Sequence, residues 1–413
     1  MNSDSSRIEV TPTSATQTIA ECLEDLDRYS KAQWRALRES GQAMTKERAD
    51  EIQTQKVNRA ASHASGFAIN KAAGADLLAL ARLYTEANQP EQAAVAVAAR
   101  LADEHLTATE RAEALLVALD QALQNPTNEK MPRAKKIAAE LGAIGIAHRI
   151  VAHGRLARAC NSLGLDQECL THRRSVIELY QKLNPSEQTS EKVRDALASA
   201  LRCNDTGSEF LYSQNRELLQ QAAAFFPNDP KLAVEKTLEI FSLVERPAPA
   251  IKAPYWLNGS PDGSTMTFGG KPALIQFTAH WCGPCRQSYP AMLRLHKRFQ
   301  QRGLEIVFVT QLFGRFGQET NLPDEKEVEA DRKYFAEEHG LPFRVAIGKP
   351  DVQSDDRTAP VERNQQNYFV TGFPTFVVID TNGRVIRVRA GGGPDVDAKL
   401  AETIEPLLLH VKA

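Results

Sequence analysis

The chain has 413 residues, more than one hydrophobic core usually organises, so at least two domains are expected. Hydrophobic residues make up 42% and charged residues 25%, which is typical of a globular protein and excludes a largely disordered chain. The formal net charge is −2 and no long basic run is present, so the composition argues against nucleic acid as a main partner.

The N-terminus shows no targeting segment. The first ten residues have neither a basic start nor an apolar run, so no signal peptide is visible. No stretch reaches the roughly 20 apolar residues that a membrane-spanning helix needs. The sequence as it stands therefore predicts a cytoplasmic protein without a membrane span. A periplasmic or otherwise exported protein whose N-terminus was processed or trimmed would look the same, and this alternative stays open.

Residues 14–245 predict an all-α domain. Ala, Leu, Glu, Gln, Arg and Lys dominate, and apolar residues recur at intervals of three and four positions. Two stretches echo each other: residues 81–84 lead through a turn to a helix near Ala93, and residues 157–160 lead to one near Cys169. The echo resembles a tetratricopeptide repeat, in which paired helices stack to bury their apolar faces. An irregular helical bundle is the alternative.

Residues 246–254 predict an extended, Pro-rich linker. Three prolines fall within the ten residues 245–254, and proline disfavours helix both at its own position and at the residue before it. We therefore expect the two parts of the chain to be separable here, with limited proteolysis cutting the exposed linker.

Residues 255–413 predict an α/β domain with a central mixed sheet. The expected strands cover residues 273–278, 304–310, 375–380 and 384–389, and the expected helices cover residues 286–302 and 324–339. Strands that alternate with helices imply parallel crossovers and a sheet covered on both faces. The last two strands meet at Thr381-Asn382-Gly383, which predicts a type I′ hairpin and an antiparallel edge.

The motif that carries chemistry is Trp281-Cys282-Gly283-Pro284-Cys285, between an expected strand and an expected helix. Free N–H groups and the helix dipole favour an anion at the first turn of a helix, so the Cys282 thiolate should be stabilised. Two intervening residues place Cys285 one turn along, close enough to attack Cys282 and release a bound substrate. We predict Cys282 as nucleophile, Cys285 as resolving thiol, a redox-active disulfide between them and no other cofactor.

The remaining cysteines and histidines have simpler interpretations. Half a zinc site has the same C-x-x-C spacing, but neither His280 nor His296 completes a tetrahedral set of ligands, so no metal site is predicted. A lone cysteine on a helix usually packs as a small buried hydrophobe, and a structural bridge is the alternative. The cysteines concerned are Cys22, Cys160, Cys169 and Cys203.

The motif at residues 281–285 resembles the active-site signature of the thioredoxin superfamily. Pro290 stands where the family has the proline that kinks the active-site helix. Residues 372–375 resemble the loop whose proline is cis and lies against the disulfide, and residues 391–393 resemble the glycine turn that borders the substrate groove. The resemblance implies that the cysteines are flanked by substrate-binding residues, namely Trp281, Gly283, Pro284, Phe373 and Pro374.

Within this superfamily, residues 246–413 are most similar to the TlpA/ResA-like branch. That branch has a hairpin-like lead-in, here near residues 255–268, and a helical insertion, here 311–341. It also has an Asp-x-Asn/Asp-Gly turn, here 380–383. The resemblance says nothing about the helical part of the chain.

The sequence departs from the family at two positions that usually carry an acid. Thioredoxins have a buried Asp six residues before the first cysteine, here Gln276, and ResA-like members have a Glu six residues after it, here Ser288. Neither side chain is a good base, so deprotonation of Cys285 should be slow near pH 7. An acid from the insertion, water or His280 would be a substitute, although His280 also fits an exposed loop residue. The charge run 318–338 predicts a solvated helix face.

The resemblance implies a thiol–disulfide oxidoreductase, more specifically a protein-disulfide reductase. It would reduce or exchange disulfides in protein substrates and receive electrons from an upstream thiol reductant, with the helical part used for protein docking or dimerisation. The alternative is a helical scaffold or adaptor whose thioredoxin-like domain mainly binds partners, against which the two intact cysteines weigh. A peroxiredoxin is excluded because the Pro-x-x-x-Thr-x-x-Cys pattern is absent around Thr278.

Overall fold

The computed structural model describes residues 17–39, 46–202, 205–207, 209–350, 362–393 and 395–409. The prediction for Cys203 therefore lies outside the described residues. The protein has two compact units: Met1–Leu37 with Glu47–Gln121 form the first, and Arg38–Lys46 with Ala122–Ala413 form the second. Among the helices in the described ranges, none combines the length and the apolar character needed to cross a lipid bilayer.

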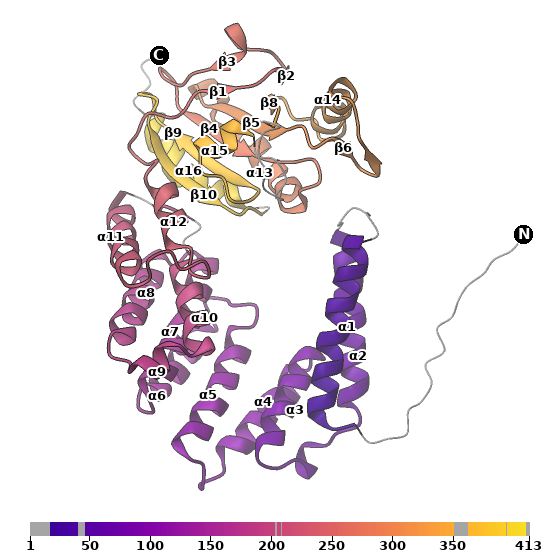
Figure 1. The fold of residues 1–413 in the computed structure, drawn as a ribbon, viewed down its shortest axis with the longest axis vertical. Helices are drawn as coiled ribbons and strands as arrows, with labels where there is room; N and C mark the ends of the chain where they lie inside the picture. The colour runs from indigo at the N-terminus through magenta and orange to yellow at the C-terminus, as the bar shows by residue number, and fades with distance from the viewer. Residues whose placement is uncertain are drawn as a thin grey trace, which may run out of the picture. The chain divides into compact units, whose positions relative to one another are not determined.

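The first unit is built from helices. They are α1 (Ile19–Glu39), α2 (Lys46–Ala64), α3 (Ala75–Glu86), α4 (Pro90–Leu101) and α5 (Ala108–Leu123), which ends at the boundary between the units (Figure 1). Apolar side chains such as Leu26, Leu80 and Leu83 share one buried cluster. Cys22 is free and buried in this cluster, as expected for a lone helical cysteine. Pro90 begins α4, where its missing N–H leaves no hydrogen bond unmade.

The second unit begins with more helices. They are α6 (Met131–Leu141), α7 (Ile146–Leu163), α8 (Asp166–Tyr180), α9 (Pro185–Gln188), α10 (Glu191–Leu201), α11 (Glu209–Phe225) and α12 (Val234–Phe241). The two stretches that echo each other in sequence are both helix pairs joined by a short turn, α3–α4 and α7–α8. Their assignment as tetratricopeptide repeats stays a prediction.

Arg173 ties three helices of this unit together. It lies on α8, is 5% exposed, and donates hydrogen bonds to the carbonyl oxygens of Ala200 (2.8 Å) and Arg202 (3.0 Å) at the end of α10. It also donates to Asn215 Oδ1 on α11 (2.8 Å). The last carbonyls of a helix have no partner within the helix, so a buried guanidinium satisfies them.

Cys160 and Cys169 lie on the facing helices α7 and α8. Both are buried, which agrees with the expectation that a lone helical cysteine packs as a small hydrophobe. Burial raises the pKa of the Cys160 thiol to about 12, so this thiol stays protonated and unreactive at neutral pH.

A six-stranded mixed sheet forms the core of the C-terminal part (Figure 1). Its spatial order is β10 (Val385–Ala390), β9 (Thr375–Ile379), β4 (Ala273–Phe277), β5 (Glu305–Gln311), β8 (Arg344–Gly348) and β2 (Tyr255–Leu257). The pairs β4–β5 and β5–β8 are parallel, and the other pairs are antiparallel. The predicted fold class, a helical region followed by an α/β domain with a mixed sheet, is confirmed.

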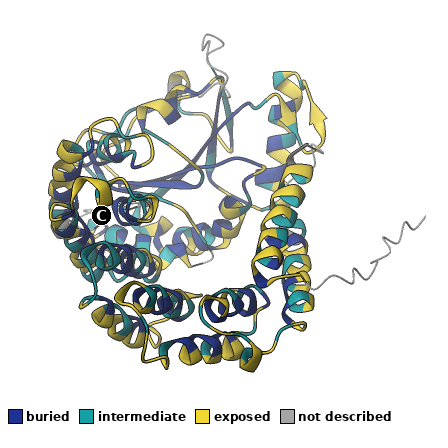
Figure 2. Ribbon diagram, turned by 60° about the horizontal axis from the view of Figure 1, so that its bottom comes forward, coloured by how far each residue is buried: buried dark blue, intermediate teal, exposed yellow. Residues whose placement is uncertain are grey.

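Both faces of this sheet are covered, and its four central strands are buried almost throughout (Figure 2). Leu274, Phe308 and Val378 lie on one face and share a cluster with α13 (Gly283–Phe299) and α16 (Val396–Leu407). On the other face, the ring of Phe277 lies 5.2 Å from that of Tyr368, which follows α15 (Arg363–Asn367). The outer segments are β1 (Ile251–Lys252), β3 (Thr265–Met266), β6 (Arg315–Phe316), β7 (Glu319–Thr320) and α14 (Asp324–Arg332).

The turn between β9 and β10 differs from its prediction. The Asp380 N–H donates to the Arg384 carbonyl, and the Gly383 N–H donates to the Asp380 carbonyl. Gly383 has a positive φ of 74°, but Asn382 does not, whereas a type I′ turn needs a positive φ at both central residues. The antiparallel pairing is therefore as expected, but the predicted turn type is wrong, because the loop is longer than two residues.

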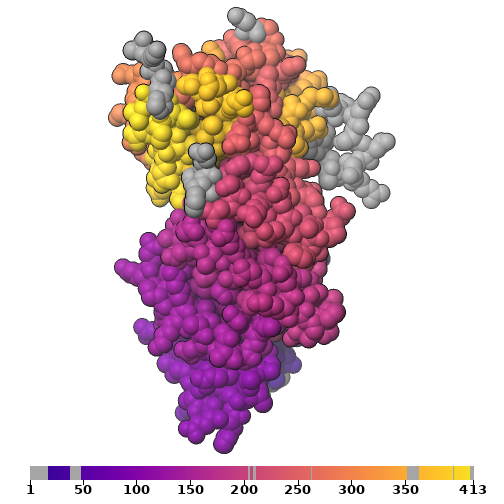
Figure 3. Space-filling view, turned by 90° about the vertical axis from the view of Figure 1, so that its left-hand side faces the viewer, coloured from indigo at the N-terminus to yellow at the C-terminus, as the bar shows by residue number. Residues whose placement is uncertain are grey.

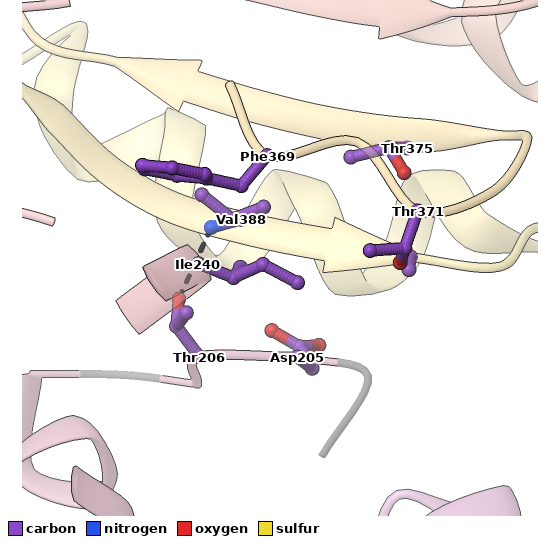
Figure 4. Close-up of a pocket in the computed structure, with 8 residues that line it drawn as sticks. Asp205, Thr206, Ile240, Phe369, Thr371, Thr375 and Val388 are labelled. Carbon is purple, nitrogen blue, oxygen red and sulfur yellow. Dashed lines mark hydrogen bonds between the residues drawn. The ribbon is translucent and has the colours of Figure 1, made fainter. Parts of the chain in front are cut away.

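The outer edge of β10 is covered by a segment from the helical part of the same unit. The Thr206 N–H donates to the Val388 carbonyl (2.9 Å), and the Val388 N–H donates to Thr206 Oγ1 (3.0 Å; Figure 4). The space-filling view shows α11 and α12 continuing into the α/β part without a gap (Figure 3). An open edge strand invites pairing with other chains, so this cover protects the sheet.

Residues 246–254 are not a free linker. The Glu245 N–H donates to the Val385 carbonyl (2.8 Å), and the Val385 N–H donates to the Arg246 carbonyl (3.0 Å). Pro247 lies in this bridge to β10, where a sheet edge tolerates its missing N–H. The segment is extended, as its prolines predict, but its neighbouring backbone groups are paired with the sheet.

Asp205 adds a buried ion pair to this contact. Its carboxylate accepts hydrogen bonds from Nε (2.8 Å) and Nη2 (2.7 Å) of Arg387, and a further one from Arg389. The Arg387 side chain is 4% exposed and that of Asp205 is 16% exposed. Burial by itself would raise the pKa of Asp205, but the two guanidinium groups hold it below its ordinary value. A cavity of about 10 Å³, the size of one water molecule, lies beside the pair near Ile240 and Phe369 (Figure 4).

Candidate functional site

Cys282 and Cys285 are joined by a disulfide at the start of α13. Cys282 caps this helix, and its Sγ accepts a hydrogen bond from the Cys285 N–H at 3.1 Å. The sulfur therefore lies where unpaired N–H groups and the helix dipole favour negative charge. Cys282 is 5% exposed, whereas Cys285 is completely buried. Of the two sulfurs, that of Cys282 is the one a substrate can approach.

The residues between and after the cysteines shape the first turns of α13. Pro284 lies in the first turn, where its missing N–H has no helical partner to lose. A side chain at Gly283 would meet open space, so the packing does not by itself require a glycine there. Pro290 lies inside α13 and cannot donate to the carbonyl one turn earlier.

Three aromatic side chains, those of Trp281, Phe373 and Phe313, form an aromatic wall next to the cysteines. The Trp281 side chain is 45% exposed, and its ring centroid lies 5.9 Å from that of Phe373 and 5.5 Å from that of Phe313. The Phe373–Pro374 peptide bond is cis, and Pro374 is buried. The structure thus brings together the predicted residues Trp281 and Phe373 and adds Phe313, which the sequence analysis missed. The Phe-Gly-Arg-Phe spacing at residues 313–316 was the available signal.

Ser288 holds the glycine turn against α13. Its Oγ donates to the Pro284 carbonyl (3.0 Å) and accepts from the Gly393 N–H (3.1 Å). A Cβ at Gly392 would collide with Ser288 Oγ and would lie 2.7 Å from Pro374 Cγ. The position where the resemblance expects a Glu is thus occupied by a hydroxyl that connects α13, the glycine turn and the cis-proline.

Gln276 lies on β4, on the face of the sheet that α13 covers. It is fully buried and is paired in register with Phe308 and Phe376, both members of the cluster that contains the cysteines. Its amide oxygen and nitrogen have no hydrogen-bond partner among the described residues. A neutral amide cannot accept the proton of Cys285, so this face of β4 offers no carboxylate base.

His280 is buried, which corrects its interpretation as an exposed loop residue. It is 8% exposed, and its ring lies 4.5 Å from that of Phe316 and 5.5 Å from that of Phe313. Its Nδ1 lies 3.4 Å from Asp331 Oδ1 on α14, which is an ion-pair distance longer than a good hydrogen bond. Burial raises the pKa of Asp331, and the nearby imidazole acts against this rise.

Part of the charge run 318–338 also faces inward, so the predicted solvated face is wrong there. Glu327 and Asp331 are fully buried, because positions four apart lie on the same side of a helix. Glu327 accepts the N–H groups of Phe313 (2.7 Å) and Gly314 (2.8 Å) and so fixes the loop that carries the aromatic wall. Burial raises the pKa of Glu327, and these two donors reduce the rise.

The C-terminal part of the chain matches a known protein family. Residues 243–404 match the family model described as Redoxin. The match begins just after α12, which ends at Phe241, and covers the whole mixed sheet together with α13 and α14. The chain therefore carries a Redoxin domain behind a helical region, and the predicted likeness to thioredoxin-like proteins over this part is confirmed.

Two relatives show the same likeness at the level of sequence. Thioredoxin-like protein YneN of Bacillus subtilis is 29% identical over 122 residues, which are 30% of this chain and 58% of YneN. Thiol-disulfide oxidoreductase ResA of Geobacillus thermodenitrificans is 30% identical over 140 residues, which are 34% of this chain and 66% of ResA. The chain thus spans less than two thirds of either relative.

A solved structure is also similar to this chain. A thiol:disulfide interchange protein of the thioredoxin family from Chlorobium tepidum is 24% identical, with a TM-score of 0.28. The alignment covers 40% of this chain and 97% of that structure.

Proposed function

We propose that the protein is a thiol–disulfide oxidoreductase that reduces or exchanges disulfide bonds in protein substrates through the Cys282–Cys285 dithiol. The observation that carries the proposal is the position of Cys282. Its sulfur caps α13 and its residue is 5% exposed, with the fully buried Cys285 one turn behind it and the exposed Trp281 beside it. A structural disulfide needs neither a helix cap nor an exposed aromatic neighbour.

The chemistry follows from this order of burial. The Cys282 thiolate attacks one sulfur of a substrate disulfide, forms a mixed disulfide and releases a substrate thiolate, which takes up a proton. Cys285 then loses its proton, and its sulfur attacks Cys282 Sγ, which releases the second substrate thiolate. Two electrons pass from the dithiol to the substrate, which leaves the Cys282–Cys285 disulfide. An upstream dithiol protein returns the two electrons, so no further cofactor is required.

The surroundings of Cys282 favour an extended, partly apolar substrate segment. Trp281, Phe373 and Phe313 give a surface of aromatic rings at contact spacing. We propose that the backbone just before Pro374, which leads into β9, pairs with a substrate peptide like a strand. We include Gly283 and Pro284 in the same contact surface, because they form the turn between the two sulfurs.

The helical part is proposed as a docking surface for protein partners. A groove of about 310 Å³ runs between α8 and α11. Polar side chains line most of it, including Arg174, Glu178, Gln214 and Glu217. Such a surface suits a polar protein partner better than an apolar ligand, which needs an enclosed apolar pocket.

Insulin reduction with a small dithiol as electron donor tests the proposal. The natural protein should accelerate the reaction, Cys282→Ser should abolish it, and Cys285→Ser should accumulate a mixed disulfide with the substrate. The matched control is Cys22→Ser, which removes a buried thiol of the other unit. A natural protein that binds disulfide substrates without turnover would instead support the adaptor hypothesis and contradict this one.

A further inference from the structure

His280, two positions before Cys282, forms a buried pair with Asp331. The Cys282 N–H donates to the Ala279 carbonyl (3.0 Å), so residues 279–282 form a tight turn that holds His280 next to Cys282. His280 Nδ1 lies 3.4 Å from Asp331 Oδ1. The ring of Phe313 lies 5.5 Å from the rings of both His280 and Trp281, so Phe313 packs against the pair and against the exposed aromatic residue of the motif.

The carboxyl group of Asp331 has little else to stabilise it. Asp331 is fully buried, and within the described ranges neither of its oxygens has a hydrogen-bond partner. An isolated buried carboxylate is very unfavourable, so the group either carries a proton or faces a cation. Its neighbour at ion-pair distance is His280. The proton therefore lies on one member of the pair or the other, and the pair is neutral overall in both arrangements.

Of the other titratable groups around the pair, the buried carboxyl group of Glu327 interacts with both His280 and Asp331, whereas the remaining groups are neutral or screened by water. Burial raises the pKa values of Tyr289 and Tyr334, so both are neutral at pH 7, and burial lowers the pKa of His339. Arg286 is exposed on α13, where water screens its charge. The carboxyl group of Glu327 is held by two backbone N–H groups. His280 is two residues from Cys282 in the chain, so the proton shared by His280 and Asp331 is an adjustable charge close to Cys282 in sequence.

We propose that His280 and Asp331 are positioning residues for the dithiol, and that protonated His280, held by ionised Asp331, stabilises the Cys282 thiolate. When Cys282 loses its proton, the shared proton moves from Asp331 towards His280, and the cation then faces the new anion. The pair thereby replaces the charge that Gln276 and Ser288 do not provide. This inference rests on the proposed function, because it matters only if the Cys282 thiolate is the attacking group.

Asp331→Asn tests the inference, with the Cys282 thiol pKa measured from the pH profile of its alkylation. The variant keeps the side-chain volume but removes the partner that holds the proton on His280. The Cys282 pKa should rise by about one unit, within the usual effect of a nearby charge. The matched control is Glu329→Gln on the same helix, whose side chain is 56% exposed. It should leave the Cys282 pKa unchanged.

The sign of the shift decides the outcome. If Asp331 were ionised beside a neutral His280, its removal would lower the Cys282 pKa, and a lower or unchanged value overturns the inference. His280→Gln should raise the Cys282 pKa to the same extent. The double variant should raise the Cys282 pKa no further than either single variant does. His280→Gln serves alone if near-ultraviolet circular dichroism shows that Asp331→Asn does not fold. Failure of the proposed function is distinguishable, because the natural protein would then not reduce insulin, whatever Asp331→Asn does.

Discussion

Replacing Asp205 with Asn should loosen the edge of the six-stranded sheet, although Asp205 belongs to the helical part of the chain. The substitution keeps the shape of the side chain and removes its charge. Arg387, whose side chain is 4% exposed, would retain hydrogen bonds to the Lys399 carbonyl and to Thr403 Oγ1 but would lose its counter-charge. Breaking a buried ion pair in this way costs about 3–5 kcal/mol. We expect about 3 kcal/mol, because Asn still accepts one hydrogen bond.

Hydrogen exchange at the Val388 amide measures this loss directly, because that amide donates to Thr206 next to Asp205. A loss of about 3 kcal/mol makes local opening roughly a hundredfold more frequent. The matched control is Asp397→Asn, since Asp397 forms a similar two-bond pair with Arg294 at side-chain exposures of 21% and 50%. An exposed pair contributes about 0–1 kcal/mol. Equal exchange in the two variants would refute the reasoning.

The same pair predicts a dependence on pH. The pKa of Asp205 is lowered in the folded protein, because the attraction of the guanidinium groups outweighs the effect of burial. Its contribution to stability is therefore complete above the ordinary Asp pKa of about 3.9 and is lost as pH falls through the lowered value. Protection of Val388 should fall in that acid range in the natural protein and stay flat in Asp205→Asn. A flat profile in both would contradict a charged Asp205.

Three further predictions concern the site and the domain boundary. Gln276→Asp should speed resolution of the mixed disulfide at pH 7. In the natural protein this step should be slow at pH 7 and should accelerate towards the free-thiol pKa of about 8.5. If stopped-flow fluorescence shows that the natural protein resolves the mixed disulfide quickly at pH 7 and at a rate independent of pH, another residue supplies the base. Gly392→Ala should lower kcat/KM for insulin reduction, because the added Cβ collides with Ser288 and crowds Pro374; unchanged kinetics would mean that the turn adjusts freely. A fragment of residues 248–413 should melt below the full chain, because it lacks the segments that cover β10; an equal Tm would show that the sheet needs no helical cover.

The local chemistry of the site was readable from the sequence. Strands β4, β5 and β9 are largely apolar segments, and β10 alternates apolar residues with arginines. The predicted bounds of all four strands differ by at most one residue from those observed. The placement of Cys282 at a helix start follows from the order strand, motif, helix, which is information carried by neighbouring residues. Strand β8, Arg344–Gly348, was not predicted. It is five residues long, and its partner β5 is identified only by the fold.

The features that the sequence did not reveal depend on contacts between distant segments. Asp205 and Arg387 are separated by 182 residues, and no local pattern connects them. The burial of His280 depends on the side of α14 that carries Asp331, and the charge run on that helix gave no sign of an inward face. An acidic residue on a helix is expected to be solvated unless its buried partner is known. The partner of Asp331 is His280, which lies on another segment of the chain.

The most direct test of the account is the order in which the two thiols react. In the fully reduced protein at pH 7, brief treatment with iodoacetamide followed by mass spectrometry should find the label on Cys282 well before Cys285. This follows from the cap position of Cys282 and its greater exposure, compared with the full burial of Cys285. Equal labelling of both thiols, or earlier labelling of Cys285, would contradict the assignment of Cys282 as the attacking sulfur.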